Sequence, residues 1–162
     1  MKLPTTLVAC VLTLFCLEQA HGRIGETEKQ ITTRYGTPLK QLAPLGSRDK
    51  CSIFVFNGFK ITVTFLDGTS QDEEFIRIPD APLSDTEITT LLSANAPAPS
   101  WTLSSNTSSA VKEWRAQGEK YEILATYCRT RSGYNLQIGT VDFIRYVSDQ
   151  MVQKEKSRLE GF

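Results

Sequence analysis

The 162-residue sequence has almost no histidine and no excess of charge of either sign. Its 18 Lys and Arg residues balance 18 Asp and Glu residues, so the formal net charge at pH 7 is zero. Proteins that bind nucleic acid or anionic membrane surfaces concentrate positive charge, so we expect neither partner. The single histidine is His21, and any mechanism that needs an imidazole depends on it.

The sequence also lacks the motifs of nucleotide and metal chemistry. It has no phosphate-binding glycine loop, and its four cysteines do not have the spacing of zinc ligands. We therefore expect no cofactor and no metal. Hydrophobic residues make up 40% of the chain, which together with the glycines is typical of a globular domain.

The N-terminal segment has the organisation of an export signal. Lys2 supplies positive charge, residues 7–17 form an apolar run, and Ala20-His21-Gly22 places small residues where a signal peptidase reads them. The run is about half of the ~20 residues that span a bilayer, which argues against a membrane anchor. We predict that residues 1–22 are cleaved off, which removes His21 and gives a periplasmic or secreted protein without a transmembrane segment.

Removal of this segment leaves residues 23–162, a length that suits one domain. Lys2 and Glu18 leave together, so the mature chain stays neutral. A lipid anchor at Cys10 is the alternative to free export, but only nine residues precede this cysteine and most of the apolar run follows it. We therefore favour a protein released from the membrane.

Two cysteines, Cys51 and Cys128, remain after cleavage and would enter an oxidising compartment. We predict a disulfide between them. Two buried free thiols are the alternative, because two cysteines form a weaker pattern than a dense framework.

The first half of the mature chain predicts one helix and three strands. The helix is expected over residues 25–35, because acidic residues stand near its start while Gly36 and Pro38 supply a cap and a stop. Residues 39–50 are expected to be a polar connection. The expected strands span 51–56, 61–65 and 73–78, and their turns are Asn57-Gly58 and Asp67-Gly68.

The second half predicts a similar series. Ser84-Asp85-Thr86-Glu87 is a capping box that begins a helix over residues 84–94. A loop with at most a short edge strand is expected at 95–109. A last helix is expected from Asp142, and residues 153–162 should form a frayed tail. The expected strands span 111–116, 121–128 and 134–139, and the apolar stripe of the last helix is Phe143, Ile144, Val147 and Met151.

These elements predict an α+β fold of antiparallel β-meanders with packed helices, in the order α-β-β-β-α-β-β-β-α. We expect two small sheets that carry helices on one side. An offset of about 60 residues aligns the two halves, with Phe54 opposite Trp114 and Val63 opposite Ile123. Two explanations of this match remain open: a duplication that gives two tandem α/β units, or two ordinary hairpins whose strands and turns have similar spacing.

Carboxylate chemistry is the one catalytic option that the residue types leave open, since paired Asp or Glu side chains can act as acid and base. The densest acidic cluster contains Asp67, Asp72 and Glu73. Its structural explanation is a turn at Asp67 and a solvated edge strand after it. A small carboxylate-dependent hydrolase is therefore the alternative function.

Aromatic residues offer a candidate binding surface, because Trp and Tyr anchor many interfaces. Trp101 lies in a loop and Tyr134 begins an expected strand. A cleft between the sheets lined by these two side chains is a further alternative for binding a small molecule.

The first half resembles a known family in its helix and first turn. Gly25-x-Thr27, Gln30-Ile31 and Tyr35-Gly36-Thr37-Pro38 resemble the G-x-T-x-x-Q-V…L-G-T-P helix of the SmpA/OmlA outer-membrane small proteins, and Phe65-Leu66-Asp67-Gly68 resembles their hairpin end. The resemblance covers about residues 24–70, and its motif residues are Gly25, Thr27, Ile31, Gly36 and Pro38. It implies the fold of two tandem α/β units found in the wider superfamily that includes the β-lactamase inhibitor protein.

Members of that family are non-enzymatic and act by binding other proteins. The resemblance therefore implies an exported, non-catalytic binding or scaffold domain of the bacterial envelope. Its partner is expected to be another envelope or secreted protein.

Overall fold

The structure, a computed structural model, describes residues 23–43, 46, 48–96, 100–105, 107, 108, 110–118 and 120–160. The expected export signal, residues 1–22, lies outside these ranges. The helices are α2 (Glu28–Tyr35), α3 (Asp85–Asn95) and α4 (Val141–Leu159). The first four strands are β1 (Lys40–Leu42), β2 (Asp49–Phe56), β3 (Phe59–Leu66) and β4 (Thr69–Arg77). The others are β5 (Thr102–Leu103), β6 (Val111–Gln117), β7 (Glu122–Thr130) and β8 (Gly133–Thr140).

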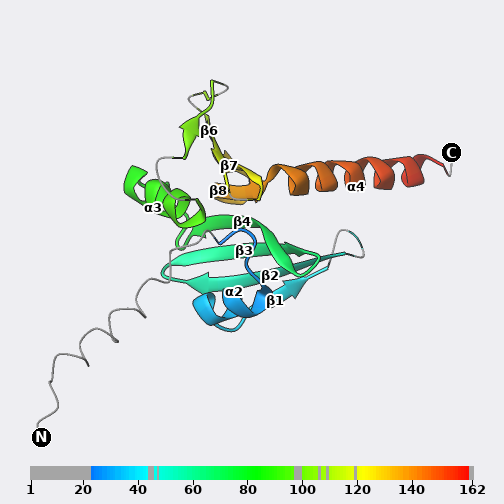
Figure 1. Cartoon of the computed structure of the whole chain (residues 1–162), viewed down its shortest axis with the longest axis horizontal. Coiled ribbons are helices and arrows are strands. Elements are labelled where there is room, and N and C mark those ends of the chain that lie inside the picture. The colour runs from blue at the N-terminus through cyan, green and yellow to red at the C-terminus, as the bar shows by residue number, and fades with distance from the viewer. Residues whose placement is uncertain are drawn as a thin grey trace, which may run out of the picture.

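These eight strands form one antiparallel sheet in the order β1-β2-β3-β4-β8-β7-β6-β5. Figure 1 labels all of them except β5. The α+β class is confirmed, but the expectation of two separate three-stranded sheets is wrong. The short strands β1 and β5 extend each meander, and β4 pairs with β8 from Asp72 opposite Gly139 to Ile76 opposite Asn135. Strands β4 and β8 are each the last strand of a meander and would otherwise leave an unpaired edge. Pairing β4 with β8 satisfies the backbone groups of both edges.

Helix α2 begins three residues later than expected because Thr27 is its N-cap. The Thr27 side chain accepts from the backbone N–H of Gln30, and the Gln30 side chain accepts in return from the backbone N–H of Thr27. At the other end, Gly36 has a φ of 86°, a backbone conformation that favours glycine. Gly36 therefore ends the helix where the sequence predicted.

Helix α3 begins with the predicted capping box. Ser84 accepts from the backbone N–H of Glu87 through its side chain, and its own N–H donates to the Glu87 carboxylate at 2.8 Å. The helix packs on the sheet through the buried side chains of Ile88, Leu91 and Leu92. The box thus fixes the first turn of a helix that contributes to the core.

We expect Ser84→Ala to lower the free energy of unfolding by about 1 kcal/mol, because it leaves the N–H of Glu87 without its acceptor. Urea unfolding followed by circular dichroism measures this loss. Thr86→Ala, in the same turn but outside the box, is the control and should change stability much less. Equal losses in the two variants would contradict the role of the box.

Helices α2 and α3 pack on one face of the sheet, and their apolar side chains form the core with the strands. Ile31 of α2 is fully buried, as are Phe54 of β2 and Phe75 of β4. The core also contains Tyr35, Ile61, Val63, Ile88, Leu91, Leu92, Ile123, Ala125, Leu136 and Ile138. This face carries the apolar half of each alternating strand.

Helix α4 lies against the opposite face, so the helices are not all on one side. Only Phe143 of this helix is buried, and the later turns of α4 extend away from the sheet (Figure 1). The expected frayed tail at 153–162 is instead helical to Leu159. Its Lys, Glu, Gln and Arg residues favour helix, and an ion pair joins Arg158 to Glu155. None of the helices in the described ranges is long and apolar enough to cross a membrane.

Candidate functional site

The described residues leave the face of the sheet opposite α2 and α3 with little cover, and we call it the open face. Residues that pair directly across antiparallel strands share a face, so the strand register defines it. At its centre, hydrogen-bonding side chains gather on the three middle strands. They are Thr62 and Thr64 of β3, Asp72 and Glu74 of β4, and Asn135 and Gln137 of β8.

Two amides of β8 hold the two carboxyl groups of β4. Gln137 Nε2 donates to Asp72 Oδ1 at 3.0 Å, and Asn135 Nδ2 donates to Glu74 Oε1 at 2.5 Å. Both bonds cross the seam between the two halves of the chain. They fix the positions of side chains that a flexible surface would leave free.

The first turns of α4 cover one end of the open face, and three contacts position them. Thr140, the N-cap, accepts from the backbone N–H of Phe143 at 3.1 Å and donates to Gln71 Oε1 at 3.0 Å. The Tyr146 hydroxyl donates to Asp49 Oδ1 at 3.1 Å. The helix is thereby attached to β2 and β4 as well as to β8.

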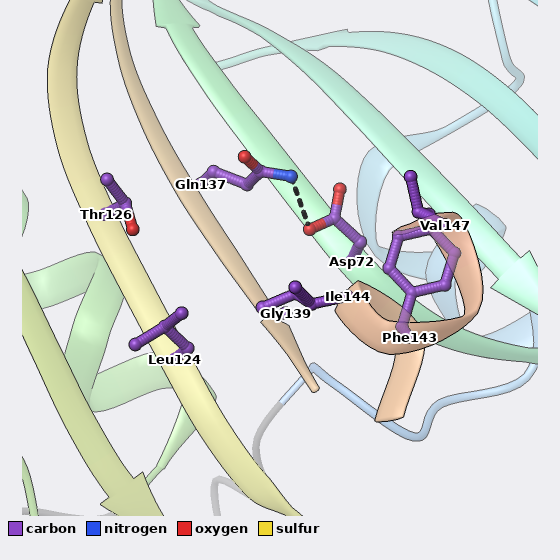
Figure 2. A pocket seen from close by; sticks show the side chains of 8 residues that line it. All are labelled: Asp72, Leu124, Thr126, Gln137, Gly139, Phe143, Ile144 and Val147. Atoms are coloured by element: carbon purple, nitrogen blue, oxygen red, sulfur yellow. Dashed lines mark hydrogen bonds between the residues drawn. The ribbon is translucent and has the colours of Figure 1, made fainter. Parts of the chain in front are cut away.

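A cavity of about 250 Å³ lies between this helix and the sheet (Figure 2). Its apolar wall comes from Leu124 of β7 and from the side chains that α4 turns toward the sheet, and Asp72 and Gln137 provide its polar groups. The full lining is Asp72, Leu124, Thr126, Gln137, Gly139, Phe143, Ile144 and Val147. A mostly apolar wall with a few fixed polar groups is typical of ligand sites.

Asp72 is the one ionisable side chain that lines this cavity, and it is 6% exposed. Burial raises the pKa of its carboxyl to about 7, against the lowering effect of the Gln137 hydrogen bond and with a further increase from the charge of Glu74. No ion pair of the described chain includes Asp72. The cavity thus contains a carboxyl group that changes its charge near neutral pH.

Gly139 makes room for this carboxyl. A Cβ at position 139 would lie 2.6 Å from Asp72 Oδ1 and 3.2 Å from the carbonyl oxygen of Gln71. The close approach of these two oxygens to the backbone therefore favours glycine at position 139.

We expect Gly139→Ala to destabilise the protein by about 1–3 kcal/mol, since an added methyl must displace a buried carboxyl and a strand carbonyl. Thermal unfolding measures the loss. The same substitution in an Asp72→Ala background should cost clearly less, because the carboxyl is then absent. An equal loss in both backgrounds would show that the methyl group does not meet Asp72.

The structure separates the acidic cluster that the sequence suggested. Asp67 lies in the exposed β3–β4 turn, where hydrogen bonds from Arg48 lower the pKa of its carboxyl. Glu73 points to the face opposite Asp72, because adjacent residues of a strand alternate. The three carboxyl groups therefore do not converge, and a hydrolytic site made from them is not formed.

Glu73 instead belongs to the core beneath α2. Its Oε2 accepts from the Tyr35 hydroxyl at 3.1 Å, and burial raises the pKa of its carboxyl to about 7 although the nearby Arg23 lowers it. The Arg23 guanidinium lies over the rings of Tyr35 and Phe75, at 5.4 and 5.8 Å from their centroids. This cluster attaches the first described residues to the sheet.

The two aromatic residues of the predicted binding surface lie near opposite ends of α3. Trp101 packs on the core, and its Nε1 donates to the Leu92 carbonyl at 2.8 Å. Tyr134 stacks on Tyr127, with ring centroids 6.3 Å apart, and the Tyr127 hydroxyl accepts from the backbone N–H of Leu83. The structure does not bring Trp101 and Tyr134 together as the walls of one cleft.

The predicted disulfide is not formed, and both cysteines are free thiols. Cys51 of β2 and Cys128 of β7 have β3, β4 and β8 between them. Four strand spacings amount to about 19 Å, whereas bonded cysteines have Cα atoms within about 7 Å. Sheet geometry therefore prevents this bridge within one chain.

No family model matches the chain, no curated protein is similar to it, and no solved structure matches its fold. Within the described ranges, no group of three or more His, Cys, Asp or Glu side chains is arranged to hold a metal ion.

Of the residues in this cavity, the sequence singled out Asp72 for function and Phe143, Ile144 and Val147 only as a docking stripe. The amide Gln137 and the glycine Gly139 were missed. Their signal is the alternation of β8, in which Asn135, Gln137 and Gly139 share a face. The alternation predicts that these three residues share a face, but it does not predict that β4 is the neighbouring strand.

Proposed function

We propose that the protein is an exported, non-catalytic binding domain of the bacterial envelope that recognises another envelope or secreted protein through the open face. The observation that carries this proposal is the uneven cover of the sheet. Helices α2 and α3 bury one face, whereas among the described helices only α4 lies on the other, with its first turns. A wide, rigid surface with fixed hydrogen-bonding groups is thereby available to a partner.

The composition of the open face supports this proposal. Apolar side chains lie toward its β1–β2 edge, where Leu42 is 37% exposed and Val55 is 52% exposed. The hydrogen-bonding groups of β3, β4 and β8 follow toward the centre. Apolar contacts beside fixed donors and acceptors are the usual make-up of protein interfaces.

The relationship to the SmpA/OmlA proteins, and a duplicated α/β unit, are part of the same proposal. Each half of the chain is a helix followed by four strands, and the strand order reads the same from either edge. Of the motif residues, Thr27 caps α2, Ile31 is fully buried and Gly36 ends the helix. The offset of 60 places Gly58 and Gly118 in the corresponding β2–β3 and β6–β7 connections. These features favour a tandem fold that acts by binding.

The test is capture of a partner from an envelope extract of the organism that encodes the protein. Immobilised wild type should retain a specific protein, and Thr62→Arg on the open face should lose most of it. The matched control is Thr89→Arg, an exposed position of α3 on the covered side, which should retain the partner. Equal retention by both variants would contradict the open face as the binding surface.

A further inference from the structure

We propose that the cavity between α4 and the sheet binds a primary alkylammonium group, with its cation on Asp72 and its carbon chain against the apolar wall. This inference deepens the proposed binding function. The alkylammonium group is either a free amine or a lysine side chain of the partner. Only the second of these sources rests on the proposed function. The cavity, the carboxyl and the wall are features of this chain alone.

The polar end of the cavity has a carboxyl oxygen that can accept a hydrogen bond from a cation. Gln137 occupies Asp72 Oδ1, and no described residue bonds Oδ2. The charged or ionisable side chains near Asp72 on this face are Glu74 on the same strand and the Cys51 thiol on β2, whose pKa burial raises. Both are acids, and no Lys or Arg of the described sheet forms an ion pair with Asp72. The side chains of α4 that line the cavity are uncharged.

The rest of the cavity suits a short hydrocarbon chain. Leu124, Phe143 and Val147 form its wall, and Ile144, which is 39% exposed, lies at its rim. The volume of about 250 Å³ is below the range of drug-sized ligands and suits a group the size of one side chain. A lysine side chain has this form, since an apolar four-carbon stem carries a compact ammonium.

Binding and ionisation support each other at this site. Burial makes this carboxyl resist ionisation, and the charge of Glu74 adds to the effect. An ammonium group supplies one, so the complex contains the ion pair Asp72–ammonium in a mostly apolar setting. A neutral chain of the same length gains only the apolar contact.

The probe is n-butylammonium chloride, titrated into the full mature chain at pH 8 and followed by NMR chemical shifts, with 1-butanol as the neutral analogue. We expect saturable shifts at Leu124 and Val147 with butylammonium, and at least tenfold weaker binding of butanol. Binding of butylammonium should weaken severalfold at pH 5.5, where Asp72 is protonated. Absence of saturation up to about 50 mM, or equal binding of butanol, would overturn the proposal.

Three variants locate the cation. Asp72→Asn keeps the shape of the side chain and should weaken the binding of butylammonium at least tenfold. Asp149→Asn removes an exposed carboxyl of α4 outside the cavity and should leave the binding of butylammonium unchanged. Val147→Trp fills the cavity and should abolish binding, which keeps the test valid if Asp72→Asn does not fold. Unchanged binding in folded Asp72→Asn or Val147→Trp would place the amine elsewhere.

A blocked lysine, Nα-acetyl-lysine N-methylamide, separates the two sources. Binding comparable to butylammonium supports a lysine side chain of a protein, and binding of butylammonium alone supports a free amine. These titrations need no partner protein. Their failure therefore refutes the alkylammonium site without affecting the capture experiment, and failed capture leaves the titrations intact.

Discussion

The protein is expected to be more stable at pH 5 than at pH 8. Burial raises the pKa of both Asp72 and Glu73 to about 7, from usual values of 3.8 and 4.5. The folded state therefore keeps two protons that the unfolded chain has already released at pH 5. Stability falls as the pH rises through this window and levels off above pH 7. Each carboxyl contributes about 2–3 kcal/mol to the difference.

Urea unfolding at the two pH values, followed by the fluorescence of Trp101 and Trp114, measures this change. Asp72→Asn cannot ionise, so it should remove about half of the pH dependence and raise the stability at pH 8. Glu87→Gln is the control, because hydrogen bonds from Ser84 lower the pKa of that carboxyl and the substitution leaves both buried acids in place. Equal stability of the wild type at pH 5 and pH 8 would contradict the assignment of two buried acids.

Leu136→Ala is expected to destabilise the whole protein by about 3 kcal/mol and to keep a single unfolding transition. Leu136 is fully buried on β8, opposite Phe75 of β4, at the seam between the two halves. Its truncation removes core contacts and leaves a cavity. Because the seam joins both meanders into one sheet, the halves should unfold together.

The tryptophans report on the second half of the chain, whereas circular dichroism reports on both. Coincident transitions by the two methods are therefore expected for wild type and Leu136→Ala. Leu103→Ala is the matched control, since Leu103 is 55% exposed on β5 and its loss should change stability little. Separate transitions would show two independent units and contradict the seam.

Local chemistry made most elements predictable. Ser84 and Glu87 specify where α3 begins, and Gly36 specifies where α2 ends, because caps act on neighbouring residues. The polar tail of α4 was predicted to fray, since its apolar stripe ends near Met151. Helix propensity and the Arg158–Glu155 pair instead extend the helix to Leu159.

Long-range pairing was not predictable in the same way. The alternation of β4 separates Asp72 from Glu73, and this could be inferred from the strand alone. The pairing of β4 with β8 joins residues that are 59 to 67 positions apart, and no local signal specifies it. The disulfide prediction failed for this reason, because the distance from Cys51 to Cys128 depends on the strand order. The cavity needs both the seam and α4, so only Asp72 was recognised in advance as a functional candidate.

The two ends of the sheet restrict how the protein meets other molecules. The edge strands β1 and β5 contain only three and two residues, so neither edge strand offers another strand a long run of free backbone groups. Short edges protect a sheet from open-ended growth and aggregation in concentrated solution. They also disfavour recognition by strand addition. The proposed partner would then be selected by side chains across the open face, and that face could be redesigned without altering the backbone that supports it.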